Sequence, residues 1–179
     1  MSVSLTPLFD AKTIRDRVAE IAAEISRTYA GLEITAIIVM NGGVFFASDL
    51  LRHIKLSVCV DSLAAGSYLH HASTGHLTLR GGMKLDPKGR HILLIDDILD
   101  TGFTLAELQK KLLADGAASC RTCVLFDKAI PPEQKKAKPD WFGFRAPPQY
   151  LVGYGMDSDE LYRNLPNICI FREDSGHDA

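Results

Sequence analysis

The chain has 179 residues, of which 46% are hydrophobic and 23% are charged. This is enough for one globular domain with a sizeable core and short for two, so we expect a single domain over residues 1–179. The net charge of −2 gives no strong positive field for nucleic acid or an anionic membrane, although a local basic patch would still allow RNA binding.

The sequence also argues against export and membrane insertion. No apolar run approaches the roughly 18 residues that a membrane-spanning helix needs, and the N-terminal MSVSLTPLFD lacks the basic region and apolar core of a secretory signal. Cys120 and Cys123 have the CxxC spacing of metal and redox sites, but SCRTCVLF reads as a strand, where this spacing puts the two side chains on opposite faces. We expect them, with Cys59 and Cys169, to be buried, reduced thiols in a cytoplasmic protein.

The first half of the chain alternates helical and extended patterns. After Asp10, apolar residues recur at spacings of three and four, which predicts a helix that Gly31 ends. These residues are Ile14, Val18, Ile21, Ile25 and Tyr29. ITAIIVM (34–40) predicts a buried strand, followed by a short helix over 44–53 and a strand over 56–60. Residues 64–89 have few large apolar side chains and predict a long mobile loop or a hairpin.

The second half continues the alternation. HILLID (91–96) predicts a third strand, then a turn and a helix over 104–114, and SCRTCVLF (119–126) predicts a fourth strand. After the polar connection PPEQKKAKPD, we expect three short strands (WFGF, YLVGY and NICIF) and a frayed tail, REDSGHDA. Strands that alternate with helices, many of them uninterrupted apolar runs, indicate an α/β fold with a mostly parallel sheet covered on both faces.

Ligands in such folds bind outside the carboxyl ends of the strands. Asp100-Thr101-Gly102-Phe103-Thr104 lies there and leads into a helix, whose free N–H groups and positive end suit a phosphate. Gly102 allows a tight turn close to an anion, and the threonine hydroxyls can add hydrogen bonds. Thr104 and Glu107 also fit a capping box, which would give Thr104 only a structural role.

Two adjacent acids, Asp96 and Asp97, come just before this turn. They would repel a phosphate, but they suit hydroxyl groups or a divalent cation, so the ligand would be a phosphorylated sugar. Asp100 would then be placed to accept a proton from a reacting group. Adjacent acids after a strand also occur in response-regulator receiver domains, but there the pair normally closes the first strand and no Thr-Gly-x-Thr follows.

IDDILDTGFT (95–104) closely resembles the phosphoribosyl-pyrophosphate (PRPP) signature of type I phosphoribosyltransferases. MNGG resembles the pyrophosphate loop of that family, and GSYLHHASTGHLTL resembles its mobile catalytic loop. LFDK, FGF, YLVGYGMD and LYRNLP resemble the purine-binding and C-terminal segments of its hypoxanthine-guanine branch. The resemblance implies the type I phosphoribosyltransferase fold, with a small hood and a mobile loop.

The resemblance also implies roles for residues around PRPP. The 5′-phosphate would lie on Asp100, Thr101, Gly102, Phe103 and Thr104, with Asp100 also acting as general base near purine N7. Asp96 and Asp97 would hold the ribose hydroxyls and assist Mg²⁺, with Asp157 as a second magnesium-associated acid. Asn41, Gly42, Gly43 and Arg163 would meet pyrophosphate, and Ser67 and Tyr68 would belong to a loop that closes over PRPP.

For the purine, the resemblance assigns Lys128 to the 6-oxo group, Tyr150 to stacking and the backbone of Leu151 to the base edge. Simpler interpretations are a solvent-facing lysine at a strand end, core positions for Tyr150 and Leu151, and a surface charge for Arg163. His70, His71 and His76 are interpreted as solvated loop residues, because nothing fixes a metal geometry.

Two positions depart from the family pattern. Asn41 stands where many members have a basic residue, and Asp96 stands where glutamate is common. We expect activity to survive both, because backbone N–H groups would bind pyrophosphate and the carboxylate is kept. The resemblance also implies a cis Met40–Asn41 peptide, at least when ligands bind.

The implied activity is magnesium-dependent transfer of the 5-phosphoribosyl group from PRPP to hypoxanthine or guanine in purine salvage, giving IMP or GMP and pyrophosphate. A homodimer or homotetramer without nucleic-acid or membrane partners is expected. One alternative is a regulator that keeps the fold and binds nucleic acid, although such proteins often lose the acid at Asp100. Another is a phosphoribosyltransferase for a different base; Lys128 and Tyr150 argue against adenine, while xanthine stays open.

Overall fold

The computed structural model describes residues 2–66, 78–80 and 82–174. The predictions for Ser67, Tyr68 and the three loop histidines lie outside these residues. Within them the elements follow in chain order as β1 (Ser2–Phe9), α1 (Ala11–Thr28), β2 (Ile34–Met40), α2 (Gly43–His53), β3 (Val58–Gly66), β4 (Thr78–Arg80), β5 (His91–Leu99), α3 (Phe103–Ala114), β6 (Ser119–Lys128), a 3-10 turn (Pro132–Gln134), β7 (Trp141–Ala146), β8 (Leu151–Val152) and β9 (Ile168–Asp174).

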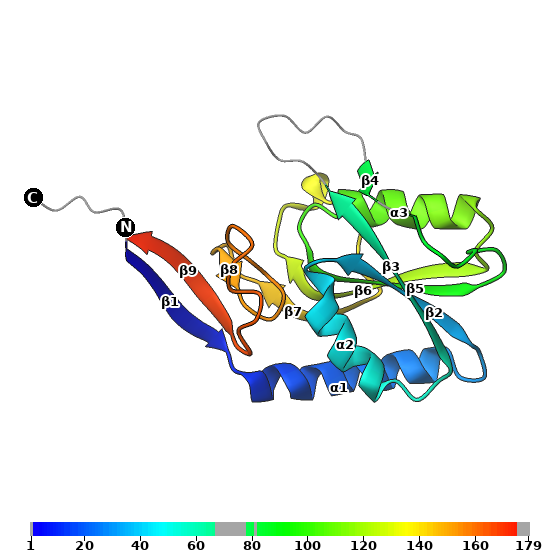
Figure 1. The fold of residues 1–179 in the computed structure, drawn as a ribbon, viewed down its shortest axis with the longest axis horizontal. Coiled ribbons are helices and arrows are strands. Elements are labelled where there is room, and N and C mark those ends of the chain that lie inside the picture. The colour runs from blue at the N-terminus through cyan, green and yellow to red at the C-terminus, as the bar shows by residue number, and fades with distance from the viewer. Residues whose placement is uncertain (1, 67–77, 81, 175–179) are drawn as a thin grey trace, which may run out of the picture.

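The main sheet has the order β4-β3-β2-β5-β6-β7. β3, β2, β5, β6 and β7 are parallel to one another, and β4 at one edge pairs antiparallel with β3. Helices α1 and α2 lie on one side of this sheet and α3 on the other (Figure 1). A second, antiparallel sheet of order β1-β9-β8 forms the hood. The predicted α/β fold is confirmed.

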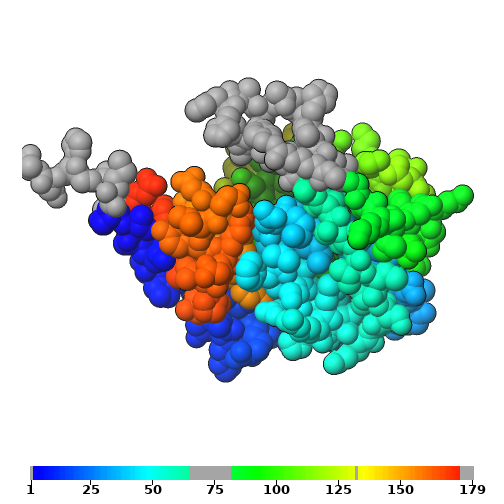
Figure 2. All heavy atoms as spheres, in the orientation of Figure 1, coloured from blue at the N-terminus to red at the C-terminus, as the bar shows by residue number. Residues whose placement is uncertain are grey.

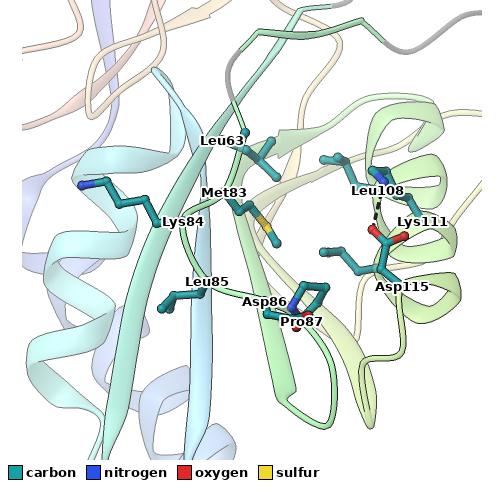
Figure 3. Close-up of a pocket in the computed structure, with 11 residues that line it drawn as sticks. Leu63, Met83, Lys84, Leu85, Asp86, Pro87, Leu108, Lys111 and Asp115 are labelled. Carbon is teal, nitrogen blue, oxygen red and sulfur yellow. Dashed lines mark hydrogen bonds and ion pairs between the residues drawn. The ribbon is translucent and has the colours of Figure 1, made fainter.

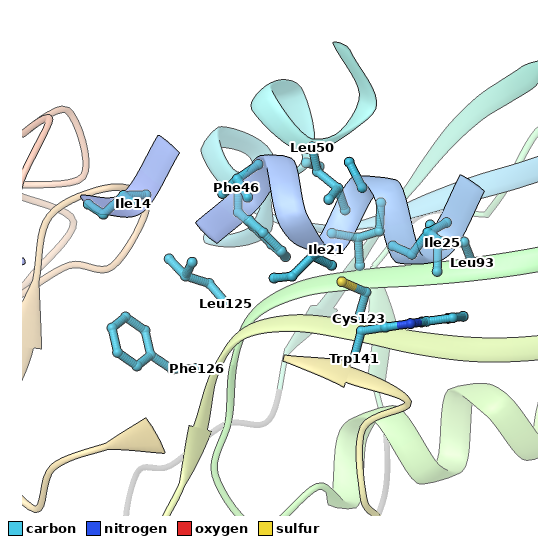
Figure 4. Close-up of a cluster of buried hydrophobic side chains, with 14 of the residues drawn as sticks. Ile14, Ile21, Ile25, Phe46, Leu50, Leu93, Cys123, Leu125, Phe126 and Trp141 are labelled. Atoms are coloured by element: carbon cyan, nitrogen blue, oxygen red, sulfur yellow. The ribbon is translucent and has the colours of Figure 1, made fainter. Parts of the chain in front are cut away.

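Alternate residues of each strand point to opposite faces of the sheet. Helices cover both faces, so the side chains on each face are buried in a core of their own. Leu93 and Leu125 join Ile21 of α1 and Phe46 of α2 in one core (Figure 4). Leu94 packs with the buried leucines of α3 in a second core, on the opposite face of the sheet. Cys120 and Cys123 belong to different cores, which confirms that they face opposite sides of β6. No helix in the described part of the chain is long and apolar enough to cross a membrane.

The structure departs from the sequence predictions at both ends of the chain and favours one of two alternatives for residues 64–89. Residues 2–9 form a strand that was not predicted; most of its side chains are exposed, although polar and apolar residues alternate over Ser2–Thr6. Residues 172–174 are paired with β1 and are not frayed. Within 64–89, β3 continues to Gly66 and pairs with β4, which favours the hairpin over the open loop.

Candidate active site

Predicted site residues from three segments meet at the carboxyl ends of β2, β5 and β6, namely residues 41–43, 96–104 and Lys128. β5 runs to Leu99, three residues past the predicted end, because it pairs with β6 as far as Leu99 and Asp127. Asp97 therefore belongs to the strand, as Asp96 was predicted to do. β5 lies between β2 and β6 and fixes the backbone of both acids, so the two carboxylates are held near the carboxyl-terminal end of a central strand.

Burial raises the pKa of both acids of the pair. For Asp96 burial is the main cause, and the negative charge of Asp97 adds to it. For Asp97 burial also dominates, while hydrogen bonds and the positive charge of Arg163 partly oppose it. Asp96 Oδ1 accepts a hydrogen bond from the N–H of Asp97 at 2.9 Å, and Asp97 Oδ1 accepts one from the N–H of Ile98 at 2.8 Å. Two ionised carboxylates in such a place call for a nearby cation.

Magnesium fits this pair when the substrate completes its coordination. Among the described residues, no cluster of three or more acidic, histidine or cysteine side chains could hold a metal. Mg²⁺, however, is usually held by one or two carboxylates, waters and substrate phosphates. Asp96 and Asp97 offer such a partial set.

The pyrophosphate loop lies directly over the acidic pair. The Met40–Asn41 peptide is cis, as the resemblance implied. A Cβ added to Gly42 would lie 2.0 Å from Asp97 Oδ2, and one added to Gly43 would lie 3.1 Å from the carbonyl oxygen of Ile95. A side chain at position 42 would displace the Asp97 carboxylate, and one at position 43 would press on the backbone of β5, because the loop approaches the end of β5 so closely.

Residues 100–104, the phosphate turn, lead from β5 into α3. Gly102 is the N-cap residue, with a left-handed φ of 81° that glycine adopts readily. Thr104 lies inside the helix, so the capping-box interpretation of Thr104 is wrong. Gly102 provides no side-chain cap, and the N–H of Phe103 donates to Thr101 Oγ1 at 3.3 Å, so the N–H groups that follow it in the first turn of α3 remain for an anion.

Two residues with different predicted roles meet beside this turn. Lys128, the last residue of β6, places Nζ 3.2 Å from Asp100 Oδ1. The lysine assigned to the purine 6-oxo group thus contacts the acid assigned as general base.

The segment after β7 closes the other side of the site. Arg163 Nη2 lies 2.8 Å from Asp157 Oδ1, and Arg163 Nη1 donates to the carbonyl oxygen of Gly155 at 2.7 Å. A Cβ on Gly155 would lie 2.1 Å from the Gly42 carbonyl oxygen, so this segment touches the pyrophosphate loop. Figure 2 shows the same contact as the orange surface lying against the cyan surface.

The simpler interpretation, a core position for both Tyr150 and Leu151, holds for the side chain of Leu151 and fails for Tyr150. Tyr150 is 57% exposed, lies edge-on to Phe171 at 5.7 Å, and donates from its hydroxyl to the carbonyl oxygen of Asp157 at 2.9 Å. It is not a core residue. The side chain of Leu151 is buried in the core, so only its backbone remains for a ligand.

Sequence reasoning missed two contacts near the site. Tyr154 donates from its hydroxyl to Asp49 Oδ2 at 2.7 Å, which ties the C-terminal segment to α2. Asp127 is buried between Lys135 and Arg145. The only signal in the sequence was an acid that follows directly on the apolar run VLF in SCRTCVLFDK.

A separate cavity of about 380 Å³ lies between residues 82–87 and the last turns of α3 (Figure 3). It is lined mainly by apolar side chains, with the Lys111–Asp115 ion pair beside it. None of the predicted site residues lines it.

Comparison with known proteins agrees with this geometry. The phosphoribosyl transferase domain family matches residues 4–159. A hypoxanthine-guanine-xanthine phosphoribosyltransferase of Tritrichomonas foetus is 37% identical over 166 residues, which are 93% of this chain and 91% of the relative. A hypoxanthine-guanine phosphoribosyltransferase of Bacillus subtilis is 34% identical over 168 residues, 92% of each protein.

Solved structures show the same fold. A hypoxanthine-guanine phosphoribosyltransferase of Bacillus anthracis aligns with a TM-score of 0.87 at 32% identity and covers 96% of this chain and 100% of that one. A hypoxanthine phosphoribosyltransferase of Staphylococcus aureus aligns with a TM-score of 0.86 at 30% identity, covering 93% of this chain and 90% of that one. The acidic pair, the phosphate turn and the pyrophosphate loop all lie within the matched residues, and the chain belongs to the type I phosphoribosyltransferase family.

Proposed function

We propose that this enzyme transfers the 5-phosphoribosyl group of PRPP to hypoxanthine and guanine in purine salvage, giving IMP or GMP and pyrophosphate. The observation that carries the proposal is the 3.2 Å contact between Lys128 and Asp100 beside the phosphate turn. A cationic donor next to an acid matches a 6-oxopurine, whose oxo group accepts a hydrogen bond and whose ring nitrogen gives up a proton.

The roles follow from the placement of each group. The N–H groups at the start of α3 and the hydroxyls of Thr101 and Thr104 would hold the 5′-phosphate. Asp96 and Asp97 would hold the ribose hydroxyls. The lone pair of purine N9 attacks C1 of the ribose, the bond from C1 to the pyrophosphate oxygen breaks, and Asp100 accepts the proton from N7. Positive charge that develops on the ribose would be stabilised by the nearby carboxylates.

On the leaving side, the backbone of Asn41–Gly43 and the guanidinium of Arg163 would receive pyrophosphate. Asp96 and Asp97 would hold Mg²⁺, which neutralises charge on pyrophosphate as it departs. Both oxygens of Asp157 are engaged in the free protein, Oδ1 by Arg163 and Oδ2 by the N–H of Glu160 at 2.9 Å. A role for Asp157 toward a second magnesium ion would require this arrangement to change.

A Lys128→Ala variant tests the purine assignment. It removes the donor for the 6-oxo group, so the KM for hypoxanthine should rise about 10- to 100-fold, while the Kd for PRPP changes little. Steady-state kinetics and PRPP titration measure the two quantities. Equal losses for purine and PRPP would mean that Lys128 acts structurally.

Xanthine is a second candidate substrate. The relative from Tritrichomonas foetus carries xanthine in its name and is 37% identical to this chain. Formation of XMP from xanthine and PRPP would establish this broader specificity.

Three further features are proposals that rest on less. A single domain over 1–179 is supported by the family match to residues 4–159. A cytoplasmic location is supported by the free thiols of Cys120 and Cys123, which the sheet keeps on opposite faces. A homodimer or homotetramer stays a prediction, which analytical ultracentrifugation would test.

A further inference from the structure

Asp127 forms a buried charge junction next to the site. It is 2% exposed, and its two carboxylate oxygens are bonded to different cations, Oδ1 to Lys135 Nζ and Oδ2 to Arg145 Nη1. The side chain of Lys135 is 12% exposed, whereas that of Arg145 is 59% exposed. A buried carboxylate requires such partners, and the more deeply buried partner is the more firmly held.

Lys135 belongs to the connection between β6 and β7, and this connection packs against the phosphate turn. The N–H of Lys136 donates to the carbonyl oxygen of Thr101 at 2.7 Å. A Cβ added to Gly102 would lie 3.0 Å from both the backbone nitrogen and the Cβ of Ala137. The residues directly after Lys135 therefore form the outer support of the turn.

The other end of the ion pair is fixed by the sheet. Asp127 lies opposite Leu99 in the pairing of β6 with β5, one residue before the turn begins at Asp100. The Asp127–Lys135 pair thus spans from the ends of β5 and β6 to the segment that supports the turn.

We propose that the Asp127–Lys135 ion pair positions the phosphate turn for PRPP, by holding residues 136–137 against Thr101 and Gly102. The inference rests on the proposed function. Asp127 and Lys135 are positioning residues, which act on PRPP through the turn. Arg145 neutralises the same carboxylate from β7, where its guanidinium lies 4.5 Å from the ring centre of Phe142, and it belongs to another element than the turn support.

Two charge variants separate positioning from general stability. Lys135→Met keeps the apolar stem and removes the cation, so the KM for PRPP should rise about tenfold while kcat and the KM for hypoxanthine stay within about twofold. Arg145→Met is the matched control, because it removes the other cation from the same carboxylate; its KM for PRPP should stay within about twofold. Lys135→Arg should restore the PRPP KM.

One further variant and a measurement independent of activity distinguish a displaced turn from a general loss of folding. Lys136→Pro removes the N–H that donates to Thr101 and keeps the side chains of Asp127, Lys135 and Arg145, and it should raise the PRPP KM as Lys135→Met does. Independently of activity, amide hydrogen exchange in residues 99–105 should be faster in Lys135→Met than in Arg145→Met.

Equal rises of the PRPP KM in Lys135→Met and Arg145→Met would overturn the proposal, and so would an unchanged KM in both Lys135→Met and Lys136→Pro. A parent enzyme that forms no nucleotide would refute the proposed function instead. The comparison of hydrogen exchange would then still decide whether the ion pair holds the turn.

Discussion

Lys128 and Asp100 neutralise each other in the free protein without a strong bond. Their side chains are 36% and 58% exposed, so solvent screens the pair and its contribution to stability is small. A purine 6-oxo group can therefore take a hydrogen bond from Lys128 at little cost. In the proposed mechanism this would leave Asp100 to accept the proton from the ring nitrogen as general base.

Replacing Asp100 with asparagine should lower kcat about 10²- to 10⁴-fold, because the variant keeps the shape of the side chain and loses the proton acceptor. The Kd for PRPP should change little. Single-turnover kinetics and PRPP titration measure the two effects. Unchanged turnover would remove Asp100 from the mechanism.

Asp96→Asn should stabilise the free protein while it impairs catalysis. Burial raises the pKa of Asp96, so the folded chain binds a proton that the unfolded chain has already released, and stability falls as pH rises from the unfolded pKa through the folded one. The variant, which carries no ionisable group at this position, should therefore be more stable than the parent at pH 7. Urea unfolding without magnesium measures this. A loss of stability would mean that the acid is held by favourable contacts in the free protein.

The acids and glycines that the structure brings together at the ends of the strands could be proposed from the sequence, because they sit in short segments directly after apolar runs. Asp127 could not, because its partners lie 8 and 18 residues further along the chain and only the fold brings them together. The role of Leu151 was also open in the sequence, since a β-strand residue can serve the core with its side chain and a ligand with its backbone.

At the scale of elements, the clearest predictions were those with a local cause. β2 has the predicted bounds because an apolar run ends at a glycine-rich loop, and α1 begins where Asp10 accepts a hydrogen bond from the N–H of Thr13 at 2.7 Å. β5 was predicted too short because its last residues are held by pairing with β6 rather than by their own propensity. Residues 2–9 become a strand only because β9 pairs with them.

Gly102→Ala tests the phosphate turn as an element. The added methyl group meets Ala137 at 3.0 Å, and a φ of 81° disfavours alanine by about 1–2 kcal/mol. We expect the variant to be less stable than the parent. Its KM for PRPP should be at least about tenfold higher, because the groups that position the substrate would be displaced. Thermal unfolding and initial rates measure the two effects.

Gly89→Ala is the matched control for this variant. Gly89 has a φ of 73°, and a Cβ there would meet nothing within 4 Å. The Gly89→Ala variant should lose about as much stability as Gly102→Ala loses through its backbone conformation, and its KM for PRPP should equal that of the parent enzyme. If both variants raised the PRPP KM equally, the effect would come from stability rather than from the turn.

At the scale of the whole molecule, two cores on opposite faces hold the sheet, and both contain neutral acids that the fold keeps protonated. Burial raises the pKa of Tyr29 to about 12 and that of Cys120 to about 12. Unfolded chains release these protons at lower pH, so the free energy of unfolding should fall as pH rises above about 9, by ~1.4 kcal/mol per pH unit for each group that titrates.

Tyr29→Phe should reduce this alkaline slope between pH 10 and pH 12 and leave stability at pH 7 nearly unchanged. The hydroxyl donates to the carbonyl oxygen of Ile92 over a long 3.5 Å and also interacts with the Ser119 side chain, so the loss at neutral pH should be small beside the change in alkaline slope. Urea unfolding across the pH range measures the slope. An identical slope in the variant would show that Tyr29 does not titrate on unfolding.

Nucleotide formation from PRPP and magnesium, with hypoxanthine, guanine, xanthine and adenine each supplied alone, tests the proposed activity. Nucleotide and pyrophosphate in equal amounts are expected from hypoxanthine or guanine, and none from adenine, whose amino group cannot accept from Lys128. No nucleotide from any base, with PRPP still bound, would contradict the proposed activity and would favour a regulator that keeps the phosphoribosyltransferase fold.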